Sequence, residues 1–542
     1  MSSRATTAAG LFIALLPTWY MLGGPPLTAS SDGRYAAVAE QMARTGDWLV
    51  PRYGERAHLT KPGLTYWAEA ASIELFGANE FAVRLPSALA MTIVVIGVFF
   101  FGRRVGGRGF GLIASMLVGV MPLPVIVGRL TLTDGLLAPC WFGVLAGGWL
   151  AIREPGRRRG SALLWSAAAV GWLVKGPIVL IPLLPLAAWR GFAGRWGELR
   201  RLRPAIGLPL SLVPIAAWAA VVWSTVPGAA GVWEHEVLGR AAGGGNHPQP
   251  FWFFIPVFLA GLFPATAMLP LPGLNLPWRR AWAALREGSD GALWSLAIVV
   301  PLVIFSLPSG KLPAYITPLA PAAAFLAAGV LSRWLDGGYD ARGVDEKPPD
   351  VRYTLLAVSV LIVVVGAGAG WVALGPRFAL LVLPAAGLVG LAVGLCRRWS
   401  AGPAARRGPL AGLWLGGAAG WLWGLTLWTL LTQPYGARQL EAFASSFARA
   451  EPARLVTFDH THYALSFYAR RHVPRIDGAE GLAEAAARGR SVVVISEAGD
   501  WRTFAKRSPA AAGAWGVRAE FSQWPRRGSW YILVPEAAGD AR

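Results

Sequence analysis

The chain has 542 residues, of which 54% are hydrophobic and 15% charged, with a net charge of +20. Soluble globular domains carry about 25% charged residues, so this composition excludes an ordinary soluble enzyme, and its hydrophobicity excludes a disordered chain. The basic residues cluster between apolar runs, which indicates membrane topology rather than nucleic-acid binding. Cys140 and Cys396 both lie in apolar runs, so the polar segments lack a disulfide framework or a thiolate metal site.

Apolar runs long enough to cross a bilayer recur until about residue 432. We predict thirteen spans with an inner N-terminus, because this arrangement puts every arginine-rich cluster on the cytoplasmic side. Merging the short runs 161–173 and 176–189 would place neighbouring clusters on opposite faces. The first run has no small-residue cleavage site and is expected to be retained. The expected spans are about 8–26, 83–101, 109–128, 134–152, 161–173, 176–189, 205–226, 251–275, 290–308, 312–332, 353–373, 378–396 and 409–432.

This topology divides the chain into a membrane domain, 1–432, and a small outer α/β domain, 433–542. Two loops of the membrane domain, about 27–82 and 227–250, also face outward. The first loop contains two runs with helical spacing, Tyr35 to Met42 and Leu64 to Phe76, and helices like the second often lie flat at the membrane interface. In the outer domain, the pattern predicts strands at 454–458, 491–496 and 529–534 and a helix at 479–487.

Two acids lie where a charge is costly, and such residues are functional candidates. Asp32 follows the first span, where capping of the next helix and catalysis explain it equally well. Asp134 lies at the outer end of two spans that are joined by almost no loop. It either pairs with Arg129 or caps the fourth span, but a second acid on the same face as Asp32 favours a shared cavity.

Three lysines are expected on the same face. Lys61 precedes a proline, which biases its backbone away from helix, and its ammonium suits a phosphate group. Lys175 and Lys311 interrupt apolar stretches at outer helix ends, whereas snorkelling lysines are expected mainly on the cytoplasmic side. Cations beside two acids therefore predict a cavity for an anionic lipid headgroup.

The second outer loop adds further titratable groups. Glu234, His235 and Glu236 are adjacent, so they do not face one another on a helix and make a poor metal site. His247 is a better candidate for a single ligand or a general acid/base, because its neutral form is populated near pH 7.

Motifs along the chain resemble those of the ArnT family, bacterial GT-C glycosyltransferases related to protein O-mannosyltransferases. The resemblance covers nearly the whole chain and is sharpest in 30–90. The first loop carries DGRYAAVAE at 32–40, GDWLVP at 46–51, KPGLTYW at 61–67 and FGANEFAVRLP at 76–86; then follow LTDGL at 132–136, LVKGP at 173–177, Arg240 with HPQP at 247–250, and SGKLPAY at 309–315.

The resemblance implies a polytopic α-helical GT-C protein of the bacterial inner membrane, with about thirteen transmembrane helices and a periplasmic C-terminal α/β domain. It implies transfer of 4-amino-4-deoxy-L-arabinose, or a similar sugar, from an undecaprenyl-phosphate carrier to lipid A or a related envelope lipid on the periplasmic face. The implied catalytic residues are Asp32 and Asp134. The implied substrate-binding residues are Arg34, Tyr35, Lys61, Lys175, Arg240, His247, Lys311 and Tyr315.

Two departures from the family pattern affect the expected chemistry. Gly33 and Thr60 stand where family members usually or often have acids. In the ArnT pattern, the acid at the position of Thr60 and the histidine of the second loop can share a bound metal ion. With Thr60 there, His247 lacks this second ligand, so no metal or other cofactor is assigned.

Two alternatives remain. The same donor chemistry can serve a protein or polysaccharide acceptor. A polyprenyl-sugar transporter is disfavoured, because the ionisable groups concentrate at one face and no inverted repeat is visible.

Overall fold

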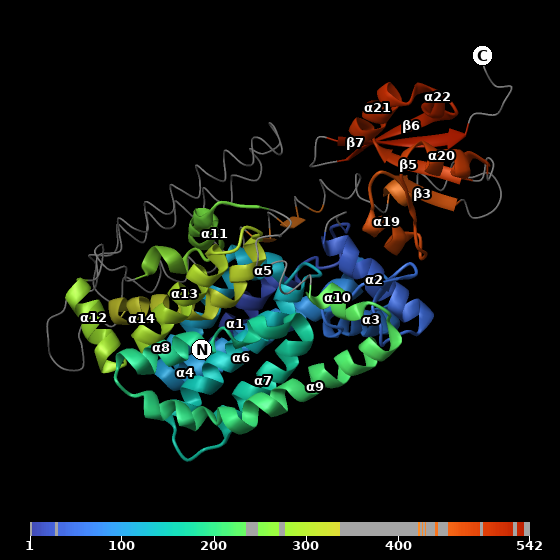
Figure 1. Cartoon of the computed structure of the whole chain (residues 1–542). Coiled ribbons are helices and arrows are strands. Elements are labelled where there is room, and N and C mark those ends of the chain that lie inside the picture. Colours follow the sequence, from blue (N-terminus) through green and yellow to red (C-terminus); the bar gives the residue numbers. More distant parts are fainter. Residues whose placement is uncertain are drawn as a thin grey trace.

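The computed structural model shows a helical bundle with a small mixed sheet beside one end (Figure 1). The described residues are 3–27, 31–234, 248–269, 277–335, 421–422, 425–426, 429, 439–442, 454–487, 492–523 and 528–535. Expected spans 353–373 and 378–396, and most of 409–432, lie outside them.

The bundle begins with helix α1, Ser3–Trp19, which packs against the long helix α4, Glu80–Val120. The backbone of α4 leaves helical geometry at Gly106 and Gly107, and this break separates the two runs that were expected as distinct spans. Gly107 has φ +87°, a conformation that glycine adopts without strain. Helix α5, Pro122–Val127, follows after a break at Met121.

Helices α6, Thr133–Arg153, and α7, Arg159–Lys175, form a hairpin in which Lys175 returns to the end where Asp134 lies. The chain then passes through η1, Gly176–Leu180, into α8, Leu183–Phe192. Arg153 and Arg190 both lie over the ring of Trp189, so the far ends of α6 and α8 meet. The chain therefore reverses between α7 and α8, as the two-span interpretation predicts.

The rest of the described bundle is a series of straight and broken helices. Elements η5 and η6 carry the chain back into the core, where α14 packs on α4. These elements are η2 (Trp196–Leu202), α9 (Pro204–Thr225), α10 (Ala229–Glu234), η4 (Phe251–Phe253), α11 (Phe254–Gly261), η5 (Ala265–Met268), α12 (Trp278–Glu287), α13 (Asp290–Ser306), η6 (Pro313–Leu319) and α14 (Ala320–Leu335).

Several of these helices have the length and apolarity of membrane spans. Among the described residues, five helices meet both criteria, or six if the bent pair α12–α13 counts as one span. Helix α6 places Asp134 and Arg153 at opposite ends, about 28 Å apart at 1.5 Å per residue, close to the thickness of the hydrocarbon core. The chain is a multi-pass membrane protein, while the predicted total of thirteen spans remains a prediction.

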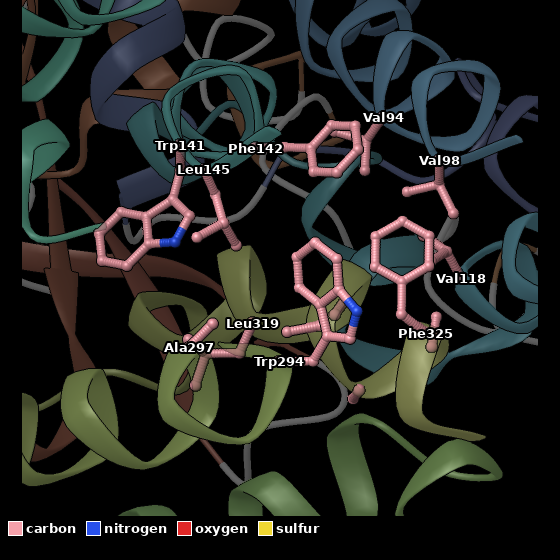
Figure 2. Packing of buried hydrophobic residues seen from close by; sticks show 14 of the residues in the cluster. Val94, Val98, Val118, Trp141, Phe142, Leu145, Trp294, Ala297, Leu319 and Phe325 are labelled. Atoms are coloured by element: carbon pink, nitrogen blue, oxygen red, sulfur yellow. The ribbon is translucent and has the colours of Figure 1, made fainter. Parts of the chain in front are cut away.

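The bundle is held by aromatic side chains from four helices. Figure 2 shows Phe142, Trp294 and Phe325 gathered beneath the valines of α4. The Trp294 and Phe325 rings have centroids 4.9 Å apart. Large buried rings bury much apolar area each, so this layer packs α4, α6, α13 and α14 into one core.

The basic clusters gather at the bundle end remote from Asp134. Arg104 pairs with Glu154, Arg153 pairs with Asp290, and the Arg201 guanidinium donates to the carbonyl of Ile152. Clusters near residues 104, 153, 190–201 and 286–290 therefore share one end, as the positive-inside argument requires.

The first outer loop contains two helices, α2 (Ser31–Thr45) and α3 (Leu64–Phe76), and a two-stranded ribbon, β1 (Arg52–Tyr53) with β2 (Arg56–Ala57). Both expected helical runs are confirmed. The interfacial placement of α3 stays a prediction, but one of its rings is not available to headgroups: Tyr66 is fully buried and stacks on Tyr35 with ring centroids 5.4 Å apart. Packing of α3 against α2 and α4 outweighs exposure at the interface because it buries this ring completely.

The C-terminal domain is a five-stranded mixed sheet in the order β4-β3-β5-β7-β6. The parallel strands are β4 (Arg475–Ile476), β3 (Arg454–Phe458) and β5 (Val492–Glu497), and β7 (Gly528–Pro535) and β6 (Trp515–Gln523) add antiparallel. The three predicted strands and the predicted helix, now α20 (Gly478–Ala487), are confirmed. Strand β6 and helices α19 (Tyr463–Tyr468), α21 (Ala498–Arg507) and α22 (Pro509–Ala512) were not predicted.

Alternating residues of the sheet build two separate cores. Val493 and Ile532 face one cluster, which includes Leu465 of α19. Val494 and Leu533 face the other, with α20, α21 and α22. Strand residues alternate between faces, so a sheet covered on both sides reads as a nearly continuous apolar run.

Helix α19 joins the C-terminal domain to the first outer loop (Figure 1). The Tyr53 hydroxyl lies 2.8 Å from the Ser466 hydroxyl. The Tyr468 hydroxyl donates to Glu80 at 3.0 Å and accepts from the Leu27 amide at 2.9 Å. These contacts fix the domain to α2, α4 and the segment that leads into α2.

Candidate active site

Asp32 lies in the first turn of α2 and is 2% exposed. Its Oδ1 accepts from the amide and the hydroxyl of Thr131, both at 3.0 Å. Its Oδ2 lies 3.3 Å from the Arg84 guanidinium. Arg84 also donates to the carbonyls of Leu22, Pro25 and Pro26. Because one buried cation and two further donors stabilise it, Asp32 is held as a fixed carboxylate between α4 and the turn before α6.

Asp134 pairs with Lys175 rather than with Arg129. The Lys175 Nζ lies 2.6 Å from Asp134 Oδ1 and 4.5 Å from the centroid of the Tyr315 ring. The expectation of an Arg129 partner is wrong, because that guanidinium donates to carbonyls of residues 17, 18, 20 and 21 at the C-terminal end of α1. Carbonyls in the last turn of a helix, such as those of Pro17 and Thr18, lack partners within that helix, and a cation there is stabilised by the helix dipole.

The two acids flank one short turn. Thr131, which holds Asp32, is followed by Leu132 and then by the first turn of α6, which carries Asp134. Tyr35 of α2 lies beside both Arg34 and Asp134, and burial raises the pKa of its hydroxyl to about 12. The structure thus places Tyr35 beside Asp134 and Tyr315 beside Lys175, with Asp32 held at the start of the same turn. The shared cavity itself stays a prediction.

Lys61 and Arg34 lie around His58 in the first loop. The Lys61 ammonium donates to the carbonyl of Thr60 at 2.7 Å. Burial, together with the positive charges of Arg34 and Lys61, lowers the pKa of His58 to about 4, so His58 is neutral near pH 7. The Thr60 hydroxyl lies 3.2 Å from His58 Nε2, so the residue that departs from the family pattern contacts a neutral imidazole.

Lys311 is buried next to the second outer loop. Gly310 forms a β-bridge with Pro248, and the Lys311 Nζ donates to the carbonyl of Gln249 at 3.0 Å. This pairing places the SGKLPAY segment against the residues that follow His247. Arg240 and His247 themselves lie outside the described residues. Within the described part of the chain, no three His, Cys, Asp or Glu residues are grouped as a metal site would need.

Sequence reasoning missed two residues of this region, Arg84 and Glu69. Arg84 lies inside the motif at 76–86, and an arginine at the start of an expected span was itself a signal. Glu69 of α3 is 0% exposed, and neither carboxylate oxygen has a hydrogen-bond partner among the described residues. Burial raises the pKa of Glu69 well above its usual value, and the negative charge of Asp32 raises it further. The fold therefore favours the protonated form of Glu69.

Comparisons with known proteins agree with this arrangement. Residues 60–223 match the family model for dolichyl-phosphate-mannose-protein mannosyltransferase. Two curated relatives are undecaprenyl phosphate-alpha-4-amino-4-deoxy-L-arabinose arabinosyl transferases. That of Aeromonas hydrophila is 31% identical over 60% of this chain and 59% of its own length. Transferase 2 of Sodalis glossinidius is 30% identical over 58% of each chain. The match thus spans about three fifths of these relatives.

The fold comparison covers the whole chain. The crystal structure of ArnT from Cupriavidus metallidurans bound to undecaprenyl phosphate superposes with a TM-score of 0.76, at 20% identity, over 99% of both chains. The fold of this chain is therefore similar to that of this ArnT. The crystal structure of the same Cupriavidus metallidurans ArnT in the apo state superposes with a TM-score of 0.73. The described acids lie at the end of the bundle next to the C-terminal domain, where α19 packs on α2.

Proposed function

We propose that this ArnT-like protein is a glycosyltransferase that moves a sugar, aminoarabinose or a similar one, from an undecaprenyl-phosphate carrier to lipid A or a related envelope lipid. The observation that carries the proposal is the pair of buried acids on either side of the Thr131–Asp134 turn, each with its own cation. The curated relatives named for this transfer support the choice of carrier and sugar.

The proposed reaction divides the work between acids and cations. The acceptor oxygen attacks the anomeric carbon of the sugar, the bond from that carbon to the carrier phosphate breaks, and undecaprenyl phosphate leaves. Asp32 or Asp134 orients or deprotonates the acceptor, because a carboxylate within hydrogen-bond reach can accept its proton. Lys61, Arg34, Arg240 and Lys311 stabilise the charge that develops on the departing phosphate.

Asp134 and Lys175 act together in this proposal. Their 2.6 Å contact joins the two side chains in a buried site, and a substrate phosphate that approaches Lys175 frees the Asp134 carboxylate for the acceptor. Tyr315 lies against the Lys175 ammonium, and Tyr35 lies beside Asp134. His247 is proposed to contact substrate from the second outer loop.

The proposed location is the bacterial inner membrane, with the site and the C-terminal domain facing the periplasm. The basic clusters at the opposite end of the bundle support this orientation, since arginine-rich loops favour the cytoplasm. A carrier-linked sugar suits this face, because no nucleotide is needed there.

The test is mass spectrometry of lipid A and envelope glycans from cells with the gene intact, deleted, or encoding Asp32→Asn. The matched control is Glu74→Gln, which removes an exposed acid from the same loop. We expect a mass increment on lipid A that is lost in the deletion and Asp32→Asn strains and kept in the control. Full transfer by the Asn variant would show that Asp32 only stabilises the fold.

A protein or polysaccharide acceptor is the second candidate, favoured by the mannosyltransferase family model that matches residues 60–223. The same strains distinguish it. Unchanged lipid A, together with loss of a sugar from a protein or a polysaccharide in the deletion strain, would support this acceptor class.

A further inference from the structure

Helix α12 turns sharply away from the bundle. Its ten residues, 278–287, are connected to α13 through a bend of 105°. Gly288 at the bend has φ +67°, which a residue with a side chain rarely adopts. Ser289 then caps α13, and its hydroxyl accepts from the Ala292 amide at 3.2 Å. Because α13 packs alongside α8 and α14 in the bundle, the bend sets α12 nearly at a right angle to these helices.

The bend is held from three sides. The Trp189 indole donates to the Ser289 carbonyl at 2.9 Å, and the Arg153 guanidinium donates to the Gly288 carbonyl at 2.9 Å. Arg153 also pairs with Asp290 at 2.6 Å. A Cβ at Gly288 would lie 2.9 Å from the Arg190 guanidinium, so the packing is close. The orientation of α12 is therefore fixed by the fold.

Helix α12 carries exposed aromatic and basic side chains. Trp278 and Trp282 lie one turn apart and are 70% and 49% exposed, while Leu285 on the same face packs on the core. Arg279, Arg280 and Arg286 are exposed as well. No residue of the helix is buried.

Exposed rings from a neighbouring segment continue this surface. The Phe192 ring meets the Trp282 ring edge-on, with centroids 6.0 Å apart, and Trp196 is also exposed. Figure 1 places α12 at the end of the bundle away from α2 and α3. Tryptophan and arginine together on a helix at this depth are typical of the membrane interface, where rings enter the headgroup region and guanidinium groups meet phosphates.

We propose that α12 is an interfacial helix that binds anionic phospholipid headgroups in the leaflet opposite the candidate active site. Three arginines against one glutamate give the helix a positive charge, which complements an anionic lipid surface. The 105° bend from a span places the helix at headgroup depth, where lipid is the surrounding partner. A soluble protein could reach α12 only if the helix projected beyond the headgroups, so lipid is the favoured partner.

The test uses purified full-length protein, delipidated in detergent and titrated with phosphatidylglycerol or phosphatidylcholine, with bound lipid counted by native mass spectrometry. The variant is Arg279→Gln/Arg280→Gln/Arg286→Gln. The matched control is Arg157→Gln/Arg158→Gln/Arg159→Gln, which removes three exposed arginines from a loop at the same end. We expect the α12 variant to bind phosphatidylglycerol about 100-fold more weakly, since each of the three arginines near an anionic surface contributes about 1 kcal/mol. Phosphatidylcholine binding should be unchanged.

A second measurement separates lipid binding from a folding defect. Hydrogen exchange of residues 278–287 in nanodiscs should be slower with phosphatidylglycerol than with phosphatidylcholine, and the variant should lose this difference while its melting temperature is unchanged. Equal losses in the variant and the control would overturn the proposal, as would exchange in α12 that does not depend on lipid charge. If the α12 variant loses lipid binding but still transfers sugar, the lipid-binding role of α12 is separate from the proposed transferase activity.

Discussion

The outer end of the bundle and the C-terminal domain bury polar groups in opposite ways. The bundle end buries full charges, including Asp32, Arg84, Asp134 and Lys311. The described C-terminal strands and helices bury uncharged groups instead, namely Thr457, Ser466, Ser496 and a neutral His462. The two regions are in contact through α19.

This difference indicates where the chemistry lies. A stable sheet with two cores forms next to the bundle without buried ion pairs among its described residues, so the fold does not require them. Burying a charge pair costs several kcal/mol per ion in desolvation, and hydrophobic replacements are often as stable. The bundle end nevertheless gathers several buried charges in one place, and a role in function explains them better than a role in stability.

The largest expected effect is at the Asp134–Lys175 pair. Asp134→Ala leaves a buried ammonium without its partner and should destabilise the protein by about 3–5 kcal/mol. The double variant Asp134→Leu/Lys175→Met should recover most of this stability and still transfer no sugar. Thermal unfolding in detergent and transfer assays measure the two quantities. A double variant as unstable as Asp134→Ala, or one that transfers sugar, would contradict a role in chemistry.

The next effect concerns Glu69. Its raised pKa means that the folded state binds the proton more tightly than the unfolded state, so stability falls as pH rises above the ordinary glutamate value. Glu69→Gln should remove this loss, at about 1.4 kcal/mol per pH unit within the affected range. The gain in melting temperature should therefore be present at pH 7.5 and absent near pH 4. A pH-independent difference would show that Glu69 is ionised in the fold.

His462 should show the opposite sign. Burial lowers its pKa to about 3, so stability is lost as pH falls below the ordinary histidine value. His462→Phe should reduce acid-induced opening of residues 454–487, by about 2 kcal/mol at pH 5. Hydrogen exchange measures this locally. His460→Phe, two residues away and half-buried, is the comparison. It removes a charge that only adds to the lowering of the His462 pKa, so it should reduce the acid-induced opening less than His462→Phe does.

The smallest effect is at the contact between the two regions. Tyr53→Phe removes the hydroxyl that meets Ser466 and should cost about 1 kcal/mol. Faster proteolysis of the C-terminal domain, with sugar transfer reduced less than tenfold, would show that the contact only positions the domain. Complete loss of transfer would make the domain part of the site.

Much of the fold could be predicted, because hydropathy reports burial directly. The helices α2, α3 and α6 and the strands β3, β5 and β7 follow from apolar spacing alone. Strand β6 was not predicted from the sequence because it lies at the sheet edge, where polar residues interrupt the apolar alternation.

Side-chain partners were harder to predict than elements. Lys175 lies 41 positions from Asp134, whereas the wrong partner, Arg129, was a near neighbour. Glu69 carried no signal, because an acid on a loop helix is ordinarily exposed and only packing against α2 and α4 reveals its burial.

Glu80 and Arg84 lie four residues apart on α4, which places them about 6 Å apart along the helix axis. Tyr468 of the C-terminal domain holds the first, and Asp32 holds the second. An α-helix is stiff over a single turn, so Tyr468 of the C-terminal domain and the Asp32 carboxylate contact the same rigid segment of α4. A tilt of the domain that pulls on Glu80 therefore shifts the guanidinium that neutralises Asp32, and the docking contact and the buried acid move as one mechanical unit.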